Sequence, residues 1–234
     1  MKIEVHPDGA AVSRRAAAWI AEVSRQAMGQ SGRFVLALSG GSTPRAMLRM
    51  LATEAIDWRR VHLTQVDERV APADSAERNL SDLRTLLLAA VPLPAAQFHP
   101  MPVDDADLPA AAGRHAQVLA LLVGAPPRLD LVQLGLGGDG HTASLVPGDP
   151  ALDVSDADVA VTASYQSCRR MTLTLPIINR ARCILWLVTG GQKAEVLARM
   201  VRGDPSLPAS RIRQASALLL ADQAAAARLP SQAV

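Results

Sequence analysis

Short apolar runs alternate with longer amphipathic stretches along most of this chain. The runs are bounded by Gly, Pro or Asp and predict strands, whereas the stretches carry apolar residues at three- and four-residue spacing and predict helices. The predicted strands cover residues 33–38, 61–66, 130–135, 170–175, 183–188 and 217–221. The predicted helices cover residues 44–53, 79–90, 108–123 and 192–202. Such alternation is typical of an α/β fold in which helices cover both faces of a doubly wound, mainly parallel sheet.

Neither a repeat nor a linker divides the 234 residues. Residues 97–107 and 146–158 are the most loop-like segments, but both are too short to join two domains. A chain of this length with 49% hydrophobic residues can bury the core of one α/β domain. We therefore expect a single domain over residues 1–234.

Charge and composition exclude several classes of function. The chain carries 24 Lys and Arg against 22 Asp and Glu, without a basic run that could follow a phosphate backbone, so we expect no nucleic-acid partner. No stretch is typical of a signal peptide or of a membrane helix, so we expect no membrane partner and a cytoplasmic location. Cys168 and Cys183 lie outside any CxxC pair and lack a His at metal-ligand spacing, which favours free thiols.

Ligands of open parallel sheets bind at the carboxyl ends of the strands, so the loops after strands are the first places to examine. The sequence LSGGSTP follows the first predicted strand and leads into a helix. Gly40 and Gly41 permit a tight turn, and the amides of Ser42 and Thr43 would then bind an anion at the helix N-terminus, with the Ser39 hydroxyl as a further donor. The alternative is an ordinary Ser- or Thr-capped helix.

The sequence VDERV places three charged residues at the end of the second predicted strand. Successive side chains of an extended chain point in opposite directions, so Asp67 and Arg69 can share one face, with Glu68 on the other. A carboxylate beside a guanidinium suits a polar substrate, whose carbonyl, carboxylate or phosphate oxygens Arg69 could hold. A surface ion pair at a strand end is the alternative.

A glycine-rich segment, GLGGDGHTASLVPG, follows the strand predicted at residues 130–135. Gly135, Gly137 and Gly140 satisfy the GxGxxG fingerprint of dinucleotide-binding folds, which opens a long helix. Pro147 and Gly148 would interrupt such a helix within two turns, and the segment lies past the middle of the chain. The pattern therefore argues against dinucleotide binding.

The same segment places Asp139 and His141 on either side of a glycine at a strand end. This spacing can present an imidazole to a cleft, with a carboxylate close enough to orient it. Imidazole is a suitable base for activating water near neutral pH. His141 is therefore the candidate general base, and we expect the other four histidines to be structural.

Two further segments, RRMTLTLP and VTGGQKAEVL, place cations near a strand end or a helix start. Lys193 falls in the first turn of a predicted helix, where a cation is unfavourable beside the positive helix end unless an anion binds nearby. A solvated side chain that reaches away from the helix is the alternative. Arg169 and Arg170 are both candidates in the other segment.

In this order, the segments resemble the 6-phosphogluconolactonase family, which is related to glucosamine-6-phosphate deaminases. The matching motifs are LSGGSTP, DERVAP with Asn79 downstream, LGLGGDGHTASLVPG, TLTLPIINRA, VTGGQKAEVL and LPASR. The resemblance implies a modified doubly wound sheet and hydrolysis of 6-phosphoglucono-1,5-lactone, with no metal or organic cofactor. It also implies that His141 is the general base, that Asp67 and Arg69 lie in the active site, and that the SGGST loop, Arg170 and Lys193 hold the phosphate.

The sequence departs from the family pattern at three places. Val70 stands where the family often has Trp, which removes an aromatic wall. Ser167, Cys168 and Arg169 replace prolines that are usual before the TLTLP arginine, so either Arg169 or Arg170 could bind the phosphate, and the register favours Arg170. Arg78 stands where a serine commonly precedes Asn79, a change expected to affect loop contacts.

Two other functions fit parts of the pattern. Amino-sugar phosphate deaminases share the GDGH segment, but they carry an acidic residue five positions after the histidine, where this chain has Val146. A non-catalytic sugar-phosphate sensor would need a DNA-binding module, for which the 32 residues before the first predicted strand are too few. The sequence leaves open whether Asp67 or Asp139 orients His141, which other sugar lactones are accepted, how the loops move, and the oligomeric state, for which a monomer is favoured.

Overall fold

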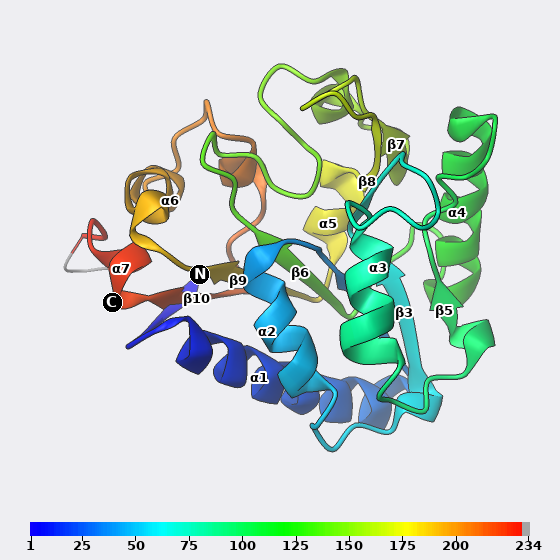
Figure 1. The fold of residues 1–234 in the computed structure, drawn as a ribbon, viewed down its shortest axis with the longest axis horizontal. Coiled ribbons are helices and arrows are strands. Elements are labelled where there is room, and N and C mark those ends of the chain that lie inside the picture. The colour runs from blue at the N-terminus through cyan, green and yellow to red at the C-terminus, as the bar shows by residue number, and fades with distance from the viewer. Residues whose placement is uncertain (231–234) are drawn as a thin grey trace.

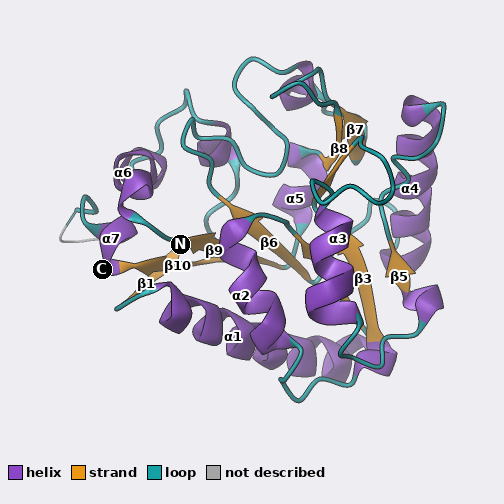
Figure 2. Cartoon of the chain, viewed as in Figure 1, coloured by secondary structure: helices purple, strands orange, loops and turns teal. Residues whose placement is uncertain are grey.

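The computed structural model describes residues 1–230, and the last four residues of the predicted domain lie outside the described part. Within residues 1–230, a seven-stranded sheet with all neighbours parallel forms the centre (Figures 1 and 2). Its strands, in spatial order, are β1 (Lys2–His6), β10 (Ala217–Asp222), β9 (Cys183–Val188), β6 (Leu131–Gly135), β2 (Phe34–Leu38), β3 (Val61–Gln65) and β5 (Phe98–His99). A second, antiparallel sheet comprises β4 (Asp67–Arg69), β8 (Arg170–Leu173) and β7 (Val159–Val161).

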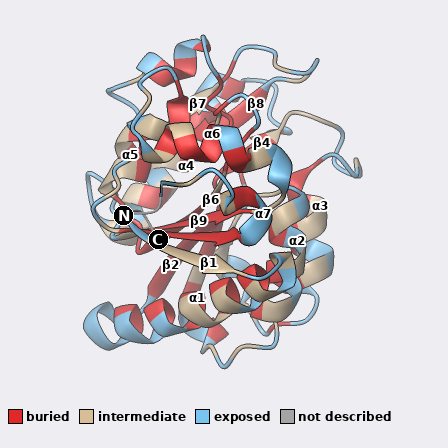
Figure 3. Ribbon diagram, turned by 90° about the vertical axis from the view of Figure 1, so that its left-hand side faces the viewer, coloured by how far each residue is buried: buried red, intermediate tan, exposed pale blue. Residues whose placement is uncertain are grey.

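Helices cover both faces of the central sheet (Figure 3). The helices are α1 (Gly9–Ser31), α2 (Ser42–Leu51), α3 (Asn79–Leu83), α4 (Leu108–Val123), α5 (Leu175–Arg180), α6 (Ala194–Val201) and α7 (Gln223–Ala226). Short helical turns are η1 (Trp58–Arg60), η2 (Arg84–Leu88), η3 (Ala95–Gln97), η4 (Pro150–Asp153), η5 (Gly191–Lys193) and η6 (Pro208–Arg211). Figure 3 shows α1 and α2 below the sheet, and α4, α5 and α6 above it with the small sheet.

Strand side chains alternate between the two faces and divide the core into two clusters. On β2, Phe34, Leu36 and Leu38 pack with α1 and α2, whereas Val35 and Ala37 belong to the cluster formed with α4, α5 and α6. All five side chains are buried. A strand buried on both faces reads as a continuous apolar run, and this is why the sequence pattern identified these strands.

The fold class predicted from the sequence is confirmed, and several boundaries are close. The strand predicted at 183–188 and the helix predicted at 108–123 coincide with β9 and α4. No long helix begins in the glycine-rich segment after β6, as Pro147 and Gly148 predicted. Both cysteines are free thiols. Among residues 1–230, no helix has the length and hydropathy that crossing a membrane requires.

The N-terminal part of the fold was missed. The first strand begins at Lys2, not at residue 33, and His6 lies on this strand instead of in a tail. β1 is the edge strand beside β10, and its polar residues alternate with Ile3 and Val5, so it lacks a continuous apolar run. α1 then follows, with the Asp8 carboxylate accepting a hydrogen bond from the Ala11 amide at its start.

Two further expectations about elements were wrong. The strand predicted at 170–175 ends at Leu173 and joins the antiparallel sheet, because Pro176 lies in the first turn of α5 and Leu175 begins that helix. The helix predicted at 79–90 has no Asn cap: Arg78 occupies the N-cap, and the helix widens into a π-helical turn at η2. β5 and β7 were also missed, since each has only two or three residues.

Three histidines lie together at one end of the fold, on β3, β5 and α4. The rings of His62 and His99 stack with 5.5 Å between centroids, and His115 Nε2 lies 3.1 Å from Thr64 Oγ1. Burial lowers the pKa of all three, and that of His115 to about 4. The neutral imidazoles are therefore part of the folded state.

We predict that acid weakens the fold through this cluster. The unfolded chain binds protons near pH 6.5, whereas folded His115 does so only near pH 4, so the free energy of unfolding should fall as the pH drops through this window. His115→Gln should remove up to about 3 kcal/mol of this dependence. Urea unfolding of both proteins between pH 4 and 8 measures it, and parallel curves would contradict the assignment.

Candidate active site

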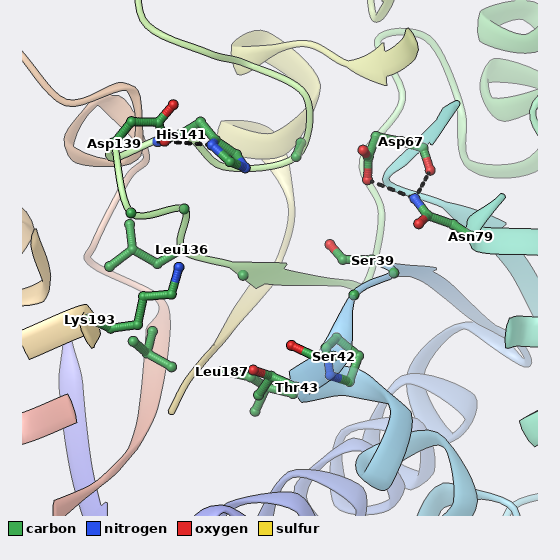
Figure 4. A pocket seen from close by; sticks show the side chains of 18 of the residues that line it. Ser39, Ser42, Thr43, Asp67, Asn79, Leu136, Asp139, His141, Leu187 and Lys193 are labelled. Carbon is green, nitrogen blue, oxygen red and sulfur yellow. Dashed lines mark hydrogen bonds and ion pairs between the residues drawn. The ribbon is translucent and has the colours of Figure 1, made fainter. Parts of the chain in front are cut away.

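A cleft of about 470 Å³ lies at the carboxyl ends of the central strands. The loops after β2, β6 and β9 line it, together with β4, β8 and the segment that precedes β8. Figure 4 shows Asp139 and His141 on one side of the cleft, Asp67 and Asn79 on the other, and Ser42 and Thr43 at the start of α2. This is the position at which parallel sheets bind ligands.

The loop after β6 holds the His141 ring against its own backbone. The Gly137 amide donates to the His141 carbonyl oxygen at 2.8 Å, which closes the loop. A Cβ on residue 137 would lie 2.2 Å from His141 Nδ1, so only glycine leaves room for the imidazole. This glycine of the GxGxxG pattern therefore leaves room for the His141 ring of the protein itself, whereas in dinucleotide-binding folds the glycine leaves room for a cofactor.

Asp139 contacts the imidazole directly. Its Oδ1 lies 2.6 Å from His141 Nδ1 and accepts the His141 amide at 3.1 Å, while Oδ2 accepts the Tyr165 hydroxyl at 3.0 Å. Partial burial raises the pKa of Asp139, but the hydrogen bonds and charge of His141 and the bond from Tyr165 outweigh it, so the pKa lies below its ordinary value. The ionised carboxylate accepts from Nδ1, which leaves Nε2 as the ring atom available to a ligand.

Asp67 is buried on the opposite wall and is held by different partners. Its Oδ2 accepts the Ser144 hydroxyl at 2.6 Å, and Asn79 Nδ2 donates to its backbone oxygen at 2.9 Å. Asn79 in turn lies against Gly40, where a Cβ would come within 1.9 Å of Asn79 Oδ1. In the described part of the chain, no hydrogen bond joins Asp67 to His141.

The neighbouring carboxylate, Glu68, points away from the cleft and is completely buried. It accepts hydrogen bonds from the backbone amides of Asn79 and Leu80, each at 2.8 Å. These amides begin α3, so Glu68 supplies the acceptor that an N-cap side chain would otherwise provide. Gln65 Nε2 donates to it at 2.6 Å, and the buried Arg78 guanidinium lies 3.9 Å away. Arg78 also pairs with Asp104, and this is a loop contact made by the residue that departs from the family pattern.

The start of α2 presents unpaired donors to the cleft. No side chain caps this helix, no acidic residue lies in its first turn, and Gly41 occupies the N-cap with a left-handed φ of 110°. Gly40, Gly41, Ser42 and Thr43 all line the cleft, as predicted. One expectation was wrong: the Ser39 hydroxyl donates to the Gln133 backbone oxygen at 2.8 Å and is not a free donor.

Three cationic side chains line the same cleft: Arg69, Arg170 and Lys193. Arg69 and Arg170 are register partners across the antiparallel pair β4 and β8, an arrangement that is unfavourable for like charges. Lys193 ends η5 and stands at the N-cap of α6. Arg169 is exposed and does not line the cleft. Of the two arginines, Arg170 is therefore the better candidate for an anion ligand, in agreement with the sequence register. Two adjacent arginines and a lysine beside helix starts form an environment that favours a bound anion.

All ten predicted site residues line the cleft. Tyr165, Gln166, Thr189 and Asn79 also line the cleft, although the sequence pattern predicted no role for them. Thr189 Oγ1 lies 3.0 Å from Thr43 Oγ1 and links the loops after β2 and β9. Tyr165 is the only tyrosine of the chain, a signal that could have directed attention to it. Among residues 1–230, no three His, Cys, Asp or Glu side chains are grouped as metal ligands.

Comparisons with known proteins identify the family of the chain and its structural neighbours. The family model described as glucosamine-6-phosphate isomerases/6-phosphogluconolactonase matches residues 7–220. The chain is 40% identical to the 6-phosphogluconolactonase of Mycobacterium tuberculosis over 98% of both chains. The structure of 6-phosphogluconolactonase from Trypanosoma cruzi superposes with a TM-score of 0.86 at 29% identity, covering 97% of this chain and 96% of that one. A monomeric glucosamine-6-phosphate deaminase shares the fold, with a TM-score of 0.86 at 20% identity over 97% of this chain and all of that one.

We predict that Glu68→Gln lowers the free energy of unfolding by about 2–4 kcal/mol. An amide NH2 cannot accept hydrogen bonds, so at least one buried amide at the start of α3 loses its acceptor, and Arg78 loses its buried counter-charge. Urea unfolding at neutral pH measures the change. Glu77→Gln is the matched control, since this side chain is exposed and should shift the value by less than about 0.5 kcal/mol. Equal shifts for both variants would refute the assigned role of Glu68.

Proposed function

The chain belongs to the family of glucosamine-6-phosphate isomerases and 6-phosphogluconolactonases, and we propose that it hydrolyses 6-phospho-D-glucono-1,5-lactone to 6-phospho-D-gluconate in the oxidative pentose phosphate pathway. The observation that carries this proposal is the imidazole of His141, held by Asp139 in a cleft that also contains three cations and an uncapped helix start. A base for water and a site for a phosphate thus lie in one cleft of suitable size for a sugar phosphate.

The phosphate group binds between the loop at residues 40–43, Lys193 and Arg170. Helix-start amides and the two cations neutralise its charge and fix the lactone ring in the cleft. Anchoring of this non-reacting group converts attack by water into a positioned reaction. Asp67, on the wall opposite His141, accepts hydrogen bonds from the sugar hydroxyls.

His141 then acts as the general base. With Nδ1 donating to Asp139, Nε2 takes a proton from water as the water oxygen attacks the lactone carbonyl carbon. Arg69 stabilises the oxyanion that forms. Collapse breaks the bond between the carbonyl carbon and the ring oxygen, which takes the proton back from the imidazolium and leaves the open-chain acid. In this scheme Asp139, not Asp67, orients the imidazole.

The deaminase alternative has less support. Its branch uses an acidic residue where this chain has Val146, and Val146 is buried, 5% exposed and absent from the cleft lining. The shared fold does not distinguish the two activities, because the deaminase structure superposes equally well. For the sensor alternative, β1 and α1, which precede the first predicted strand, belong to the same domain, because β1 pairs with β10 and α1 packs in the core below the central sheet. A single domain, a monomer, a cytoplasmic location and catalysis without metal or cofactor remain predictions.

Enzymatically generated 6-phosphogluconolactone provides the direct test. We expect its loss to be much faster with the protein than by spontaneous hydrolysis, with acid release measured at constant pH. Glucosamine 6-phosphate in a parallel assay should give no ammonia. Activity on the amino sugar alone, or on neither compound, would overturn the proposed function.

Removing the imidazole should lower turnover strongly. His141→Ala is expected to reduce kcat by roughly 100-fold or more, because general-base catalysis contributes on this scale. Gly137→Ala should approach this effect with His141 intact, since the added methyl group displaces the ring.

Gly113→Ala is the control, because residue 113 lies on α4 outside the cleft and a Cβ there meets no atom within 4 Å. It should retain nearly full kcat, and circular dichroism should show the same fold for all three variants. Unchanged turnover in a correctly folded His141→Ala protein would remove His141 from the mechanism.

A further inference from the structure

A short hairpin before β8 brings Tyr165 into the cleft. Tyr165 and Cys168 exchange backbone hydrogen bonds of 3.0 and 3.2 Å across a two-residue turn. Both turn residues, Gln166 and Ser167, have left-handed φ angles of 51° and 62°. Turns of this kind favour Asn and Gly, so this hairpin holds an unfavourable backbone conformation beside the site.

The hydroxyl of Tyr165 provides a hydrogen bond to the second oxygen of the Asp139 carboxylate. It donates to Oδ2 at 3.0 Å while Oδ1 lies 2.6 Å from His141 Nδ1, so each oxygen of Asp139 has its own side-chain partner. A carboxylate fixed at both oxygens cannot rotate away from the imidazole. The Tyr165 hydroxyl thereby limits the orientation of His141.

The ring of Tyr165 contacts both the base and a cation. Its centroid lies 5.7 Å from that of His141, with the planes 68° apart, an edge-to-face geometry. The Arg170 guanidinium carbon lies 5.2 Å from the same centroid, within the range of a cation–π contact. Gln166 Oε1 accepts from Arg170 Nη2 at 3.4 Å, so the hairpin holds this side chain at two points.

This arrangement falls where the sequence departs from the family pattern. Ser167 and Cys168 replace residues for which the resemblance leads one to expect prolines, and Pro has a fixed negative φ that a left-handed turn excludes. The left-handed turn that carries Tyr165 is therefore incompatible with a proline at residue 167.

We propose that Tyr165 is a positioning residue, whose hydroxyl fixes the Asp139 carboxylate that orients His141 and whose ring holds Arg170 in the same cleft. The proposal rests on the proposed function, in which His141 is the base and Arg170 a phosphate ligand. Tyr165 takes no proton from the substrate and acts only through these two neighbours.

Two substitutions separate the hydroxyl from the ring. Tyr165→Phe keeps the stacking on Arg170 and removes one hydrogen bond, so kcat should fall roughly 3- to 10-fold with little change in KM. Tyr165→Leu removes both contacts, so KM for the lactone should also rise by roughly 3-fold. Ser164→Ala, an exposed position in the same loop, is the matched control and should leave both constants unchanged.

A pH profile distinguishes positioning from general loss of structure. Without the tyrosine donor, Asp139 holds the imidazolium more strongly, and the acid limb of kcat/KM for Tyr165→Phe should move to higher pH by roughly half a unit. The charged groups facing this cluster are Arg170 and Arg69 on β8 and β4, Asp67 on β4, and Lys193 beside α6, and none is altered by the substitution.

The outcomes separate the two proposals. If the unmodified protein hydrolyses the lactone while Tyr165→Phe matches it in kcat and in the position of the acid limb, the positioning role is wrong and the proposed function stands. Equal KM values for the Phe and Leu variants would refute the role of the ring. If the unmodified protein shows no lactonase activity, the proposed function itself fails.

Discussion

The buried carboxylate of Glu68 is the constraint on which the geometry of the cleft depends. It has no exposure to solvent, and three backbone amides, the Gln65 amide group and the Arg78 guanidinium surround it. These contacts tie the segment after β3 to the start of α3 and fix which way β4 faces. Because side chains alternate along β4, burying Glu68 on one side obliges Asp67 and Arg69 to face the cleft.

The orientation of β4 in turn determines the position of the neighbouring walls of the cleft. β4 pairs with β8, which places Arg170 opposite Arg69. The side chain of Asn79, the first residue of α3, reaches both Asp67 and the glycine turn after β2. Like charges in direct register and an uncapped helix start raise the energy of the ligand-free cleft. Under the proposed function, a dianionic phosphate bound beside these groups offsets this cost.

The two carboxylates of the cleft differ in their partners and therefore in what they can do. Asp139 lies on a loop whose glycines admit the imidazole, and its two oxygens are shared between His141 and Tyr165. Asp67 lies on a strand and is tied to Ser144 and Asn79 across the cleft. In sequence both are an Asp near the end of a strand, and although Asp139 is only two residues from His141, this proximity alone does not exclude Asp67 as the carboxylate that contacts the imidazole.

The sequence by itself determined the fold class, the strands of the sheet interior and all ten predicted residues of the cleft. These are properties of local pattern: strands buried on both faces leave continuous apolar runs, and loops after parallel strands converge at one edge. It did not reveal β1, whose exposed edge breaks the apolar run, or the antiparallel sheet of β4, β7 and β8, whose strands are short.

Only the tertiary structure decided which side chains meet. The contact of Tyr165 with Asp139 spans 26 positions in sequence, and that of Ser144 with Asp67 spans 77. Such distances carry no periodic signal, because they depend on how the chain returns to the same edge of the sheet. The sequence therefore identified the chemical groups of the site, and the packing of distant loops fixed their partners and orientation.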